Sequence, residues 1–596
     1  MTDSKRIPNS IIPSSYDIFI DFINNEKILP ASVTIHFIKN HNNISDISDE
    51  SEGVKQSESE TAYLAVSKNI VIKSIKQNNK PIRFTIFKRK GLVAIFPSTS
   101  PFISLTVSPV TIEYQIPVGS NYEGLYKSKN LYITDLEPNN AQMFVPCFDE
   151  PCIKSIFNVS LLIPNQLNCI SNMPLKSKTQ NIFATNEKNQ RNELISLINI
   201  DNKESQTSYH DAILYEFYPT PPICTYLLCF AVGKFSLAFS DTSNRVPIHL
   251  FCQKKTDEHQ KYVSIASKAL NWLENKFGVK YPLPHLQLIS HSGIYSGMEN
   301  YGLITLHELD VDPISRTDVL LLIHEIVHMW FGDIITIKWW DSLWLNESFA
   351  QLLSYYITQE FCPEFNIWEF FYKNEIKNSL YLYSKQSIVP NNPNQLHINS
   401  SLFTKVIYNK NCFVMKMFVD IVGYDNFMKF LTKYVQKYSG IGLVDTNDFL
   451  GLCQDYFPIT HDYFDNWLYK KGFPILYIDD QKNLIQQIQT DKSVYYFPLS
   501  IQLSKNGTVK NETILIKEEE TNFCMDECDW IIVNSESKSL CLVCYSNDLL
   551  KKLEKHKKDG NLTEKDSYLI NQSFRVLYEI SHPILEKVNI ELIQTI

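Results

Sequence analysis

The stretch Leu322-Ile323-His324-Glu325-Ile326-Val327-His328-Met329-Trp330 decides how the rest of this sequence is interpreted. It contains the pattern H-E-x-x-H, and Glu347 follows after eighteen intervening residues. On a helix, His324 and His328 are four positions apart and lie on one face, so both imidazoles can reach one metal ion. Zinc is bound tetrahedrally by imidazole nitrogens and carboxylate oxygens, and a catalytic site keeps the fourth position for water. The pattern therefore predicts a zinc site made by His324, His328 and Glu347, with Glu325 beside the metal.

The alternative is a chance match on a surface helix, and the neighbouring residues argue against it. The predicted helix is apolar nearly all round, as expected of a buried helix. Its apolar residues are 319–323, 326, 327, Met329 and Trp330. Histidine and glutamate are costly in such a helix unless they are paired or bind a metal. Thr317 and Asp318 are the predicted cap at its beginning.

The composition is that of a large globular protein. A chain of 596 residues is too long for one hydrophobic core, so several domains are expected. The formal net charge of −9 and the lack of a basic run argue against a nucleic-acid surface. Residues 1–6 have no apolar segment of the secretory type, and no run of eighteen apolar residues predicts a transmembrane helix.

Thirteen scattered cysteines, an odd number, favour free thiols in a reducing compartment and hence a cytoplasmic location. Cys524, Cys528, Cys541 and Cys544 suggest a second zinc site. However, their region alternates like a strand, in which Cys541 and Cys544 would face opposite sides. Apolar packing of these thiols is the favoured alternative.

Period-two alternation predicts a β-rich segment over residues 7–240. Its predicted strands cover residues 16–22, 31–37, 69–75, 92–96, 103–114, 157–163 and 226–232. Residues 41–60 are rich in Asn, Ser, Asp and Glu, which predicts a looped or disordered insertion.

Helical periodicity begins near residue 258. Besides the H-E-x-x-H helix, the predicted helices cover residues 261–277, 344–357, 411–422 and 425–438. From about residue 474, strands at 476–478, 495–503, 512–517 and 530–533 predict a small β-sandwich, and the last fifty residues look helical. The predicted domains of this multidomain α+β chain are therefore 1–238, 239–472, 473–545 and 546–596.

A second motif, Ser296-Gly297-Met298-Glu299-Asn300-Tyr301-Gly302, is expected in an edge strand or loop, and a solvated turn is the alternative for Glu299. G-x-M-E-N followed by H-E-x-x-H and a glutamate eighteen residues later resembles the zinc aminopeptidase family typified by aminopeptidase N. Other similar segments are Leu136-Glu137-Pro138, residues 144–151 (FVPCFDEP), residues 339–350 and Gly472-Phe473-Pro474. The resemblance covers nearly all of residues 7–580.

The resemblance implies a fold and a set of roles. The fold would be a β-rich, saddle-like N-terminal domain, a thermolysin-like zinc catalytic domain, the β-sandwich and a short helical C-terminal remnant. His324, His328 and Glu347 would bind one zinc ion per chain, and Glu325 would be the general base. Gly297, Met298, Glu299, Asn300 and Glu137 would bind substrate, with Glu299 and Glu137 on its free α-amino group. Tyr408 would stabilise the tetrahedral intermediate, although without the resemblance it is one tyrosine among thirty-two.

The implied activity is removal of the N-terminal residue from peptides with a free N-terminus, by a monomer or weak dimer. An α-ammonium held by two carboxylates limits how far the peptide can enter, which makes the enzyme an exopeptidase. Two alternatives stay open. One is a leukotriene-hydrolase-like epoxide hydrolase with aminopeptidase activity, and the other is a catalytically silent peptide-binding scaffold.

The sequence also departs from the family pattern. Relatives commonly have Gly-Ala where Ser296-Gly297 stands, Arg where Gln142 stands, and Lys-Gly-Ala where Lys410-Asn411-Cys412 stands. Relatives usually end in a long helical-repeat domain, of which residues 546–596 would be only a remnant. This remnant would have too few helices to form a stacked repeat array, so a more open zinc cleft is expected.

Overall fold

The computed structural model describes residues 6–8, 10–23, 26–40, 61–96, 104–180, 211–294, 296–310, 313–380, 387–390, 396, 398, 406–489, 492–560 and 562–595. The predicted insertion at 41–60 lies outside the described residues. The chain divides into two compact units. Unit 1 comprises residues 1–275, 279–340 and 397–400, and unit 2 comprises residues 276–278, 341–396 and 401–596.

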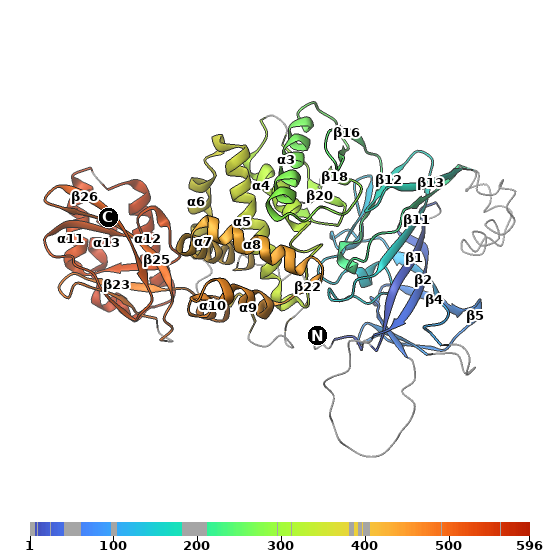
Figure 1. Cartoon of the computed structure of the whole chain (residues 1–596), viewed down its shortest axis with the longest axis horizontal. Helices are drawn as coiled ribbons and strands as arrows, with labels where there is room; N and C mark the ends of the chain where they lie inside the picture. The colour runs from blue at the N-terminus through green and yellow to red at the C-terminus, as the bar shows by residue number, and fades with distance from the viewer. Residues whose placement is uncertain are drawn as a thin grey trace, which may run out of the picture. The chain divides into compact units, whose positions relative to one another are not determined.

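Unit 1 begins with an eight-stranded mixed sheet of order β13-β14-β11-β1-β2-β8-β4-β5 (Figure 1). Its central strand β1 pairs in parallel with β11 and antiparallel with β2. Tyr16, Ile18 and Ile20 are buried at alternate positions of β1, as the period of a strand requires. The strands are β1 (Ile11–Asp21), β2 (Ile28–Lys39), β4 (Val71–Gln77), β5 (Lys80–Pro81), β8 (Val110–Pro117), β11 (Ile156–Pro164), β13 (Leu175–Gln180) and β14 (Ala212–Phe217).

Two smaller sheets complete the β-rich part of unit 1. One has the order β12-β15-β10-β9 and the other β3-β7-β6. Their strands are β3 (Ala62–Ala65), β6 (Phe84–Phe87), β7 (Leu92–Ile95), β9 (Gly124–Ser128), β10 (Leu131–Asp135), β12 (Asn168–Ser171) and β15 (Phe230–Gly233), with short 3-10 helices η1 (Ala141–Met143) and η2 (Thr225–Leu227). A β-rich segment over residues 7–240 is therefore confirmed.

A five-stranded sheet of order β16-β17-β18-β20-β19 carries the motif residues of unit 1. β17, β18 and β20 are parallel, whereas β19 is a two-residue antiparallel edge strand. Ile289 and Leu303 of this sheet share a buried cluster with Ile133 and Ala231 of the four-stranded sheet, which joins the two. The elements of this part of unit 1 are β16 (Ser236–Asp241), β17 (Ile248–Cys252), α3 (His259–Phe277), β18 (Leu286–His291), β19 (Gly297–Met298), β20 (Leu303–His307), α4 (Arg316–His328) and β21 (Thr336–Ile337).

Three strand predictions in unit 1 are corrected. The strand expected at 103–114 begins only at Val110, and the one expected at 226–232 is a 3-10 turn followed by β15. β18 was not predicted at all. Every residue of β18 is buried, so side chains on both its faces are covered and it has no alternating pattern to detect.

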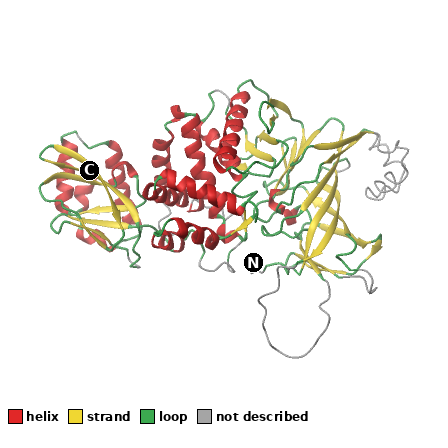
Figure 2. Cartoon of the chain, in the orientation of Figure 1, coloured by secondary structure: helices red, strands yellow, loops and turns green. Residues whose placement is uncertain are grey.

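The first part of unit 2 is helical (Figure 2). The prediction of a helix at 411–422 is confirmed, and the one at 425–438 begins one residue earlier, at Tyr424. Phe449 of α9 has aromatic contacts with Trp344 and Phe349 of α5, which forms part of the core. The elements are η3 (Trp340–Ser342), α5 (Trp344–Phe361), η4 (Pro363–Phe365), α6 (Ile367–Leu380), the π-helix η7 (Val406–Lys410), α7 (Asn411–Val422), α8 (Tyr424–Tyr438), β22 (Leu443–Val444), α9 (Thr446–Tyr456) and α10 (Thr460–Tyr469).

The second part of unit 2 has two small sheets, of order β27-β24-β23-β29 and β26-β25-β28. Their strands are β23 (Ile475–Asp479), β24 (Leu484–Gln487), β25 (Phe497–Lys505), β26 (Thr508–Ile516), β27 (Glu520–Asn522), β28 (Cys528–Val533) and β29 (Leu542–Tyr545), with the 3-10 helix η8 (Ser535–Ser537). The helical end of the chain comprises α11 (Asn547–Lys558), α12 (Glu564–Glu579), η9 (Pro583–Lys587) and α13 (Ile590–Thr595). α11 packs on β28 and α12 on β29, so these helices cover strands of both sheets.

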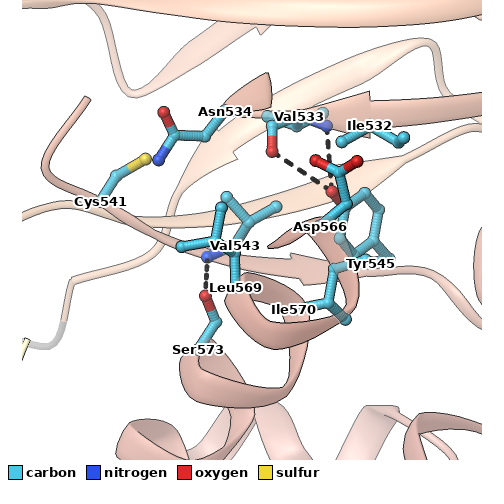
Figure 3. A pocket seen from close by; sticks show the side chains of 10 residues that line it. All are labelled: Ile532, Val533, Asn534, Cys541, Val543, Tyr545, Asp566, Leu569, Ile570 and Ser573. Carbon is cyan, nitrogen blue, oxygen red and sulfur yellow. Dashed lines mark hydrogen bonds between the residues drawn. The ribbon is translucent and has the colours of Figure 1, made fainter. Parts of the chain in front are cut away.

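Side chains complete the hydrogen bonding of the strand ends beneath α12 (Figure 3). The Ser573 hydroxyl accepts the backbone N–H of Val543 at 3.3 Å, and the Tyr545 hydroxyl accepts that of Val533 at 3.0 Å. A pocket here is lined by both strands and α12, with Cys541 among its residues. One side chain of α12 and one of β29 therefore satisfy backbone groups that a strand end would otherwise expose.

The cysteines of this region do not resemble a metal site. Cys528, Cys541 and Cys544 are buried, whereas Cys524 is exposed. Among the described residues, the His, Cys, Asp and Glu groups close enough to share a metal include none of these four. Within the parts of the chain that the structure describes, no helix is both long and apolar enough to cross a membrane.

Candidate active site

Helix α4, which carries H-E-x-x-H, begins at Arg316, and its N-cap lies two residues before the predicted cap at Thr317 and Asp318. Ser315 is the N-cap, and its hydroxyl accepts the backbone N–H of Asp318 at 3.4 Å. Asp318 has another role. Its carboxylate bonds His307 Nε2 at 2.9 Å and accepts the backbone N–H of Asp310 at 2.7 Å. Asp318 therefore fixes the end of strand β20 to the first turn of α4.

The two motif histidines converge inside the protein. His324 and His328 are 7% and 1% exposed, and their Nε2 atoms lie 3.0 Å apart. Two nitrogens bound tetrahedrally to one zinc ion at 2.0–2.1 Å would be roughly 3.3 Å apart, close to this separation. His328 Nδ1 lies 2.9 Å from the carbonyl oxygen of Phe331. Donation from Nδ1 to that carbonyl leaves the Nε2 lone pair available to a metal.

Glu347 lies in the first turn of α5 and is buried. Two hydrogen bonds within unit 2 fix this turn: Asn411 Nδ2 donates to the Trp344 carbonyl at 3.3 Å, and Trp344 Nε1 donates to the Thr446 hydroxyl at 2.9 Å. The Glu347 carboxylate is of the kind that zinc accepts beside two imidazoles, so Glu347 is a candidate third ligand.

The G-x-M-E-N segment lies at the edge of the five-stranded sheet. Gly297 and Met298 form β19, and Glu299 and Asn300 follow it directly. Glu299 is only 3% exposed, so the alternative of a solvated turn is wrong. Ligand atoms of Glu299, Glu325 and His328 lie within 4.8 Å of one another. Two carboxylates and one imidazole therefore lie close together where the chain after β19 meets α4.

A buried asparagine that sequence reasoning missed holds this segment in place. Asn172 Nδ2 donates to the carbonyl oxygens of Tyr301 and Leu227, each at 2.8 Å. Its Oδ1 accepts the backbone N–H of Cys229 at 2.8 Å. Gly302 packs so closely here that a Cβ atom would lie 2.4 Å from the Asn172 carbonyl oxygen, and its φ of +87° also favours glycine. Asn172 therefore fixes the chain two residues after Glu299.

Carboxylates of the β-rich part add to the acidic character of the site. Carboxylate oxygens of Glu137 and Glu299 lie within 4.8 Å of each other. Asp135, at the end of β10, is two residues before Glu137. Burial, with a smaller contribution from the Glu299 charge, raises the pKa of Asp135 to about 7. Asp135 was not predicted, although it stands next to the quoted Leu136-Glu137-Pro138 segment.

The loop that follows α4 contains a further buried carboxylate. Asp333 is 2% exposed, and burial followed by the nearby Glu299 charge raises its pKa well above the ordinary value. Lys154 Nζ donates to the Asp333 and Ile334 carbonyls at 2.9 and 3.1 Å, and the Tyr226 hydroxyl donates to the Gly332 carbonyl at 3.1 Å. These bonds fix the loop, and no motif in the sequence pointed to them.

Tyr408 lies on the π-helix η7, a helical form that is frequent at functional sites. Lys410, at the end of this π-helix, is 2% exposed. Burial lowers its pKa to about 7, and its Nζ donates to the Lys470 carbonyl at 3.4 Å. The departure from the family pattern at residues 410–412 therefore falls where the π-helix passes into α7. The catalytic role of Tyr408 stays a prediction.

Comparisons with known proteins agree with this arrangement. Residues 12–190 match the Peptidase M1 N-terminal domain, and residues 262–467 match the Peptidase family M1 domain. The chain is 29% identical over 463 residues to the Tricorn protease-interacting factor F2 of Thermoplasma volcanium, covering 73% of this chain and 53% of that protein. It is 27% identical over 466 residues to the puromycin-sensitive aminopeptidase of Caenorhabditis elegans, covering 72% of this chain and 46% of that protein. It is 25% identical over 457 residues to the alanine/arginine aminopeptidase of Saccharomyces cerevisiae, covering 72% of this chain and 49% of that protein. The chain thus spans about half the length of these relatives.

Proposed function

The chain belongs to the peptidase M1 family, and on that basis we propose that it is a zinc-dependent aminopeptidase that removes the N-terminal residue from peptides. The observation that carries the proposal is the convergence of the buried His324 and His328 Nε2 atoms to 3.0 Å beside Glu325 and Glu299. Relatives are named aminopeptidases, which favours this activity over epoxide hydrolysis or a silent scaffold.

One Zn²⁺ ion is the proposed cofactor, with His324, His328 and Glu347 as its ligands. When bound there, zinc would supply an activated water and a polarised scissile carbonyl. The hydrogen bond from His328 Nδ1 to the Phe331 carbonyl would keep the imidazole in the ligating tautomer. The buried surroundings of all three ligands would exclude competing water.

Glu325 is the proposed general base. Its carboxylate would take a proton from the attacking water and later give it to the leaving amine. Tyr408 is proposed to donate its hydroxyl proton in a hydrogen bond to the oxyanion of the tetrahedral intermediate, which stabilises charge mainly in the transition state.

Glu299 and Glu137 are the proposed anchors of the substrate α-ammonium. Their oxygens lie within 4.8 Å of each other, a separation that one ammonium group can bridge with two charge-assisted hydrogen bonds. Backbone groups of Gly297, Met298 and Asn300 are proposed to line the same subsite. Since the ammonium must lie at these carboxylates, only one residue would extend beyond the scissile bond.

The finer fold assignments also remain proposals. They are a saddle-like domain at 1–238, a thermolysin-like domain at 239–472, a β-sandwich at 473–545 and a helical end at 546–596. A cytoplasmic location is supported by thirteen free cysteines, because free thiols persist in reducing compartments. A monomer or weak dimer stays a prediction.

The test is a panel of aminoacyl fluorogenic substrates, assayed with and without a chelator, on the wild type and Glu325→Gln. We expect wild-type turnover that the chelator abolishes and zinc restores. Glu325→Gln is nearly isosteric and keeps the zinc ligands, so it should retain about one zinc ion per chain and lose about a hundred- to ten-thousand-fold in rate. Loss of zinc from Glu325→Gln, or unchanged turnover, would refute the assigned role.

A further inference from the structure

One part of the β-rich region of unit 1 carries charge of a single sign. Residues 61–112 contain eight Lys or Arg and no Asp or Glu, although the whole chain has a formal net charge of −9. Within the described part of the chain, Lys76 is the one cation of the eight with an ion pair, to Glu113 at 2.7 Å. The other seven are exposed: Lys68, Lys73, Lys80, Arg83, Lys88, Arg89 and Lys90. A surface field of one sign attracts ligands of the opposite sign.

A groove with a volume of about 230 Å³ lies within this basic surface, where the start of β4 meets the β6–β7 hairpin. Val66 and Ile70 are only 4% and 7% exposed, whereas Val71 and Ile86 are 48% and 38% exposed. The apolar lining consists of Val66, Ile70, Val71, Ile72, Ile86 and Leu92, and the exposed Lys68 and Lys88 line the groove as well. The groove is therefore apolar inside and bordered by positive charge.

Protection of a sheet edge is the alternative explanation for these cations. Lysines keep exposed edge strands from pairing with other chains, and β6 is the edge strand of its sheet. That role does not account for Lys88, Arg89 and Lys90, which lie in the turn after β6, or for the groove. Partly exposed apolar side chains bordered by polar ones are typical of an interaction surface.

The shape of the groove favours a polypeptide among anionic partners. Its volume lies between the roughly 150 Å³ of a cavity that binds benzene and the roughly 300–1,000 Å³ of small-molecule sites, so one large apolar side chain fits. A flat membrane surface could not reach the buried Val66 and Ile70. Nucleic-acid phosphates would contact the cations and leave the groove empty.

We propose that this groove binds an acidic polypeptide segment of a partner protein, with one large apolar side chain in the groove and carboxylates on the surrounding cations. The apolar side chain supplies most of the affinity, and the carboxylates supply specificity and a faster encounter. None of these residues belongs to the proposed active site. The proposal is therefore independent of the aminopeptidase activity.

The test is fluorescence anisotropy on the full chain with the peptide Asp-Glu-Asp-Leu-Asp-Glu-Asp, labelled with fluorescein at its amino group. The blocked amino group prevents the proposed aminopeptidase from shortening this leucine probe. A serine probe has serine in place of the leucine. The variants are Lys88→Glu/Arg89→Glu and Ile86→Ser. Their matched controls are Lys254→Glu/Lys255→Glu and Leu237→Ser, because these positions are exposed in unit 1 and lie outside the groove.

We expect saturable binding of the leucine probe by the wild type that weakens as salt is raised, because salt screens surface charges. Lys88→Glu/Arg89→Glu should weaken binding about tenfold or more, whereas the matched charge reversal should change it by less than about twofold. Ile86→Ser should weaken binding of the leucine probe about threefold to tenfold. It should leave binding of the serine probe unchanged, because the lost contact is already absent there. Leu237→Ser should change neither.

Equal losses in the two charge reversals would indicate a nonspecific charge effect and overturn the proposal. An Ile86→Ser loss that is the same for both probes would also overturn it, as would a wild type without saturable binding. Tighter binding of single-stranded oligothymidylate or of phosphatidylserine vesicles than of the leucine probe at physiological salt would assign the surface to another class of partner. If Ile86→Ser does not fold, the wild type decides, because equal affinities for the two probes would refute an apolar side chain in the groove.

Discussion

Replacing Asn172 with alanine should loosen the connection between the β-rich part of unit 1 and the G-x-M-E-N segment. The side chain is 1% exposed and makes three hydrogen bonds of 2.8 Å, two to carbonyl oxygens and one from a backbone N–H. At a net contribution of about 1 kcal/mol per hydrogen bond, the free energy of unfolding should fall by about 3 kcal/mol. Buried groups left without partners would increase the loss toward about 5 kcal/mol. One of the three bonds holds Tyr301, two residues after Glu299, so KM for free-amine substrates should also rise.

The assay is thermal unfolding combined with substrate kinetics. For a cooperative unit of 150–250 residues, a loss of about 3 kcal/mol lowers the unfolding temperature by about 6–12 °C. Asn168→Ala is the control, because Asn168 begins the strand that ends one residue before Asn172, is exposed, and donates a single bond, to the Phe235 carbonyl at 2.8 Å. If Asn172→Ala is no less stable than Asn168→Ala, the three bonds do not hold the segment and the reasoning is refuted.

Three further predictions concern the site and its supporting contacts. Glu299→Ala should lower kcat/KM on free-amine substrates while amino-blocked peptides stay poor, because the ammonium loses one paired carboxylate; unchanged kinetics on free-amine substrates would place the anchor elsewhere. Tyr408→Phe should leave KM nearly unchanged and lower kcat by an amount equivalent to about 3–4 kcal/mol, as loss of an oxyanion donor does; a normal kcat would point to another donor. The hydrogen bond to Asp318 raises the pKa of His307 above its ordinary value. Its stabilisation is therefore complete below the unfolded pKa of about 6.5 and is lost as pH rises through the folded pKa. The unfolding-temperature difference between wild type and His307→Asn should shrink over that range, and a constant or growing difference would contradict the assignment.

The sequence by itself determined those features that depend on local spacing. The four-residue separation of His324 and His328 specifies one helix face wherever a helix forms, and α4 has that spacing. The bounds of α7 could be predicted because its apolar residues repeat with the helical period and Gly423 ends it. Strands β1 and β2 could be predicted because apolar side chains recur at alternate positions along them.

The tertiary structure decided the features that depend on residues far apart in the chain. Strand β18 carries no alternation because all its residues are buried, and Glu299 is buried beside Glu325 and His328 of α4. Asp318 does not cap α4, because its carboxylate is hydrogen-bonded to His307 and to the backbone N–H of Asp310. The role of Asn172 has no sequence signal, since its hydrogen bond to Tyr301 joins positions that are 129 residues apart. Periodicity reports which face of an element is buried, whereas the identity of the atoms that meet there depends on how the elements pack.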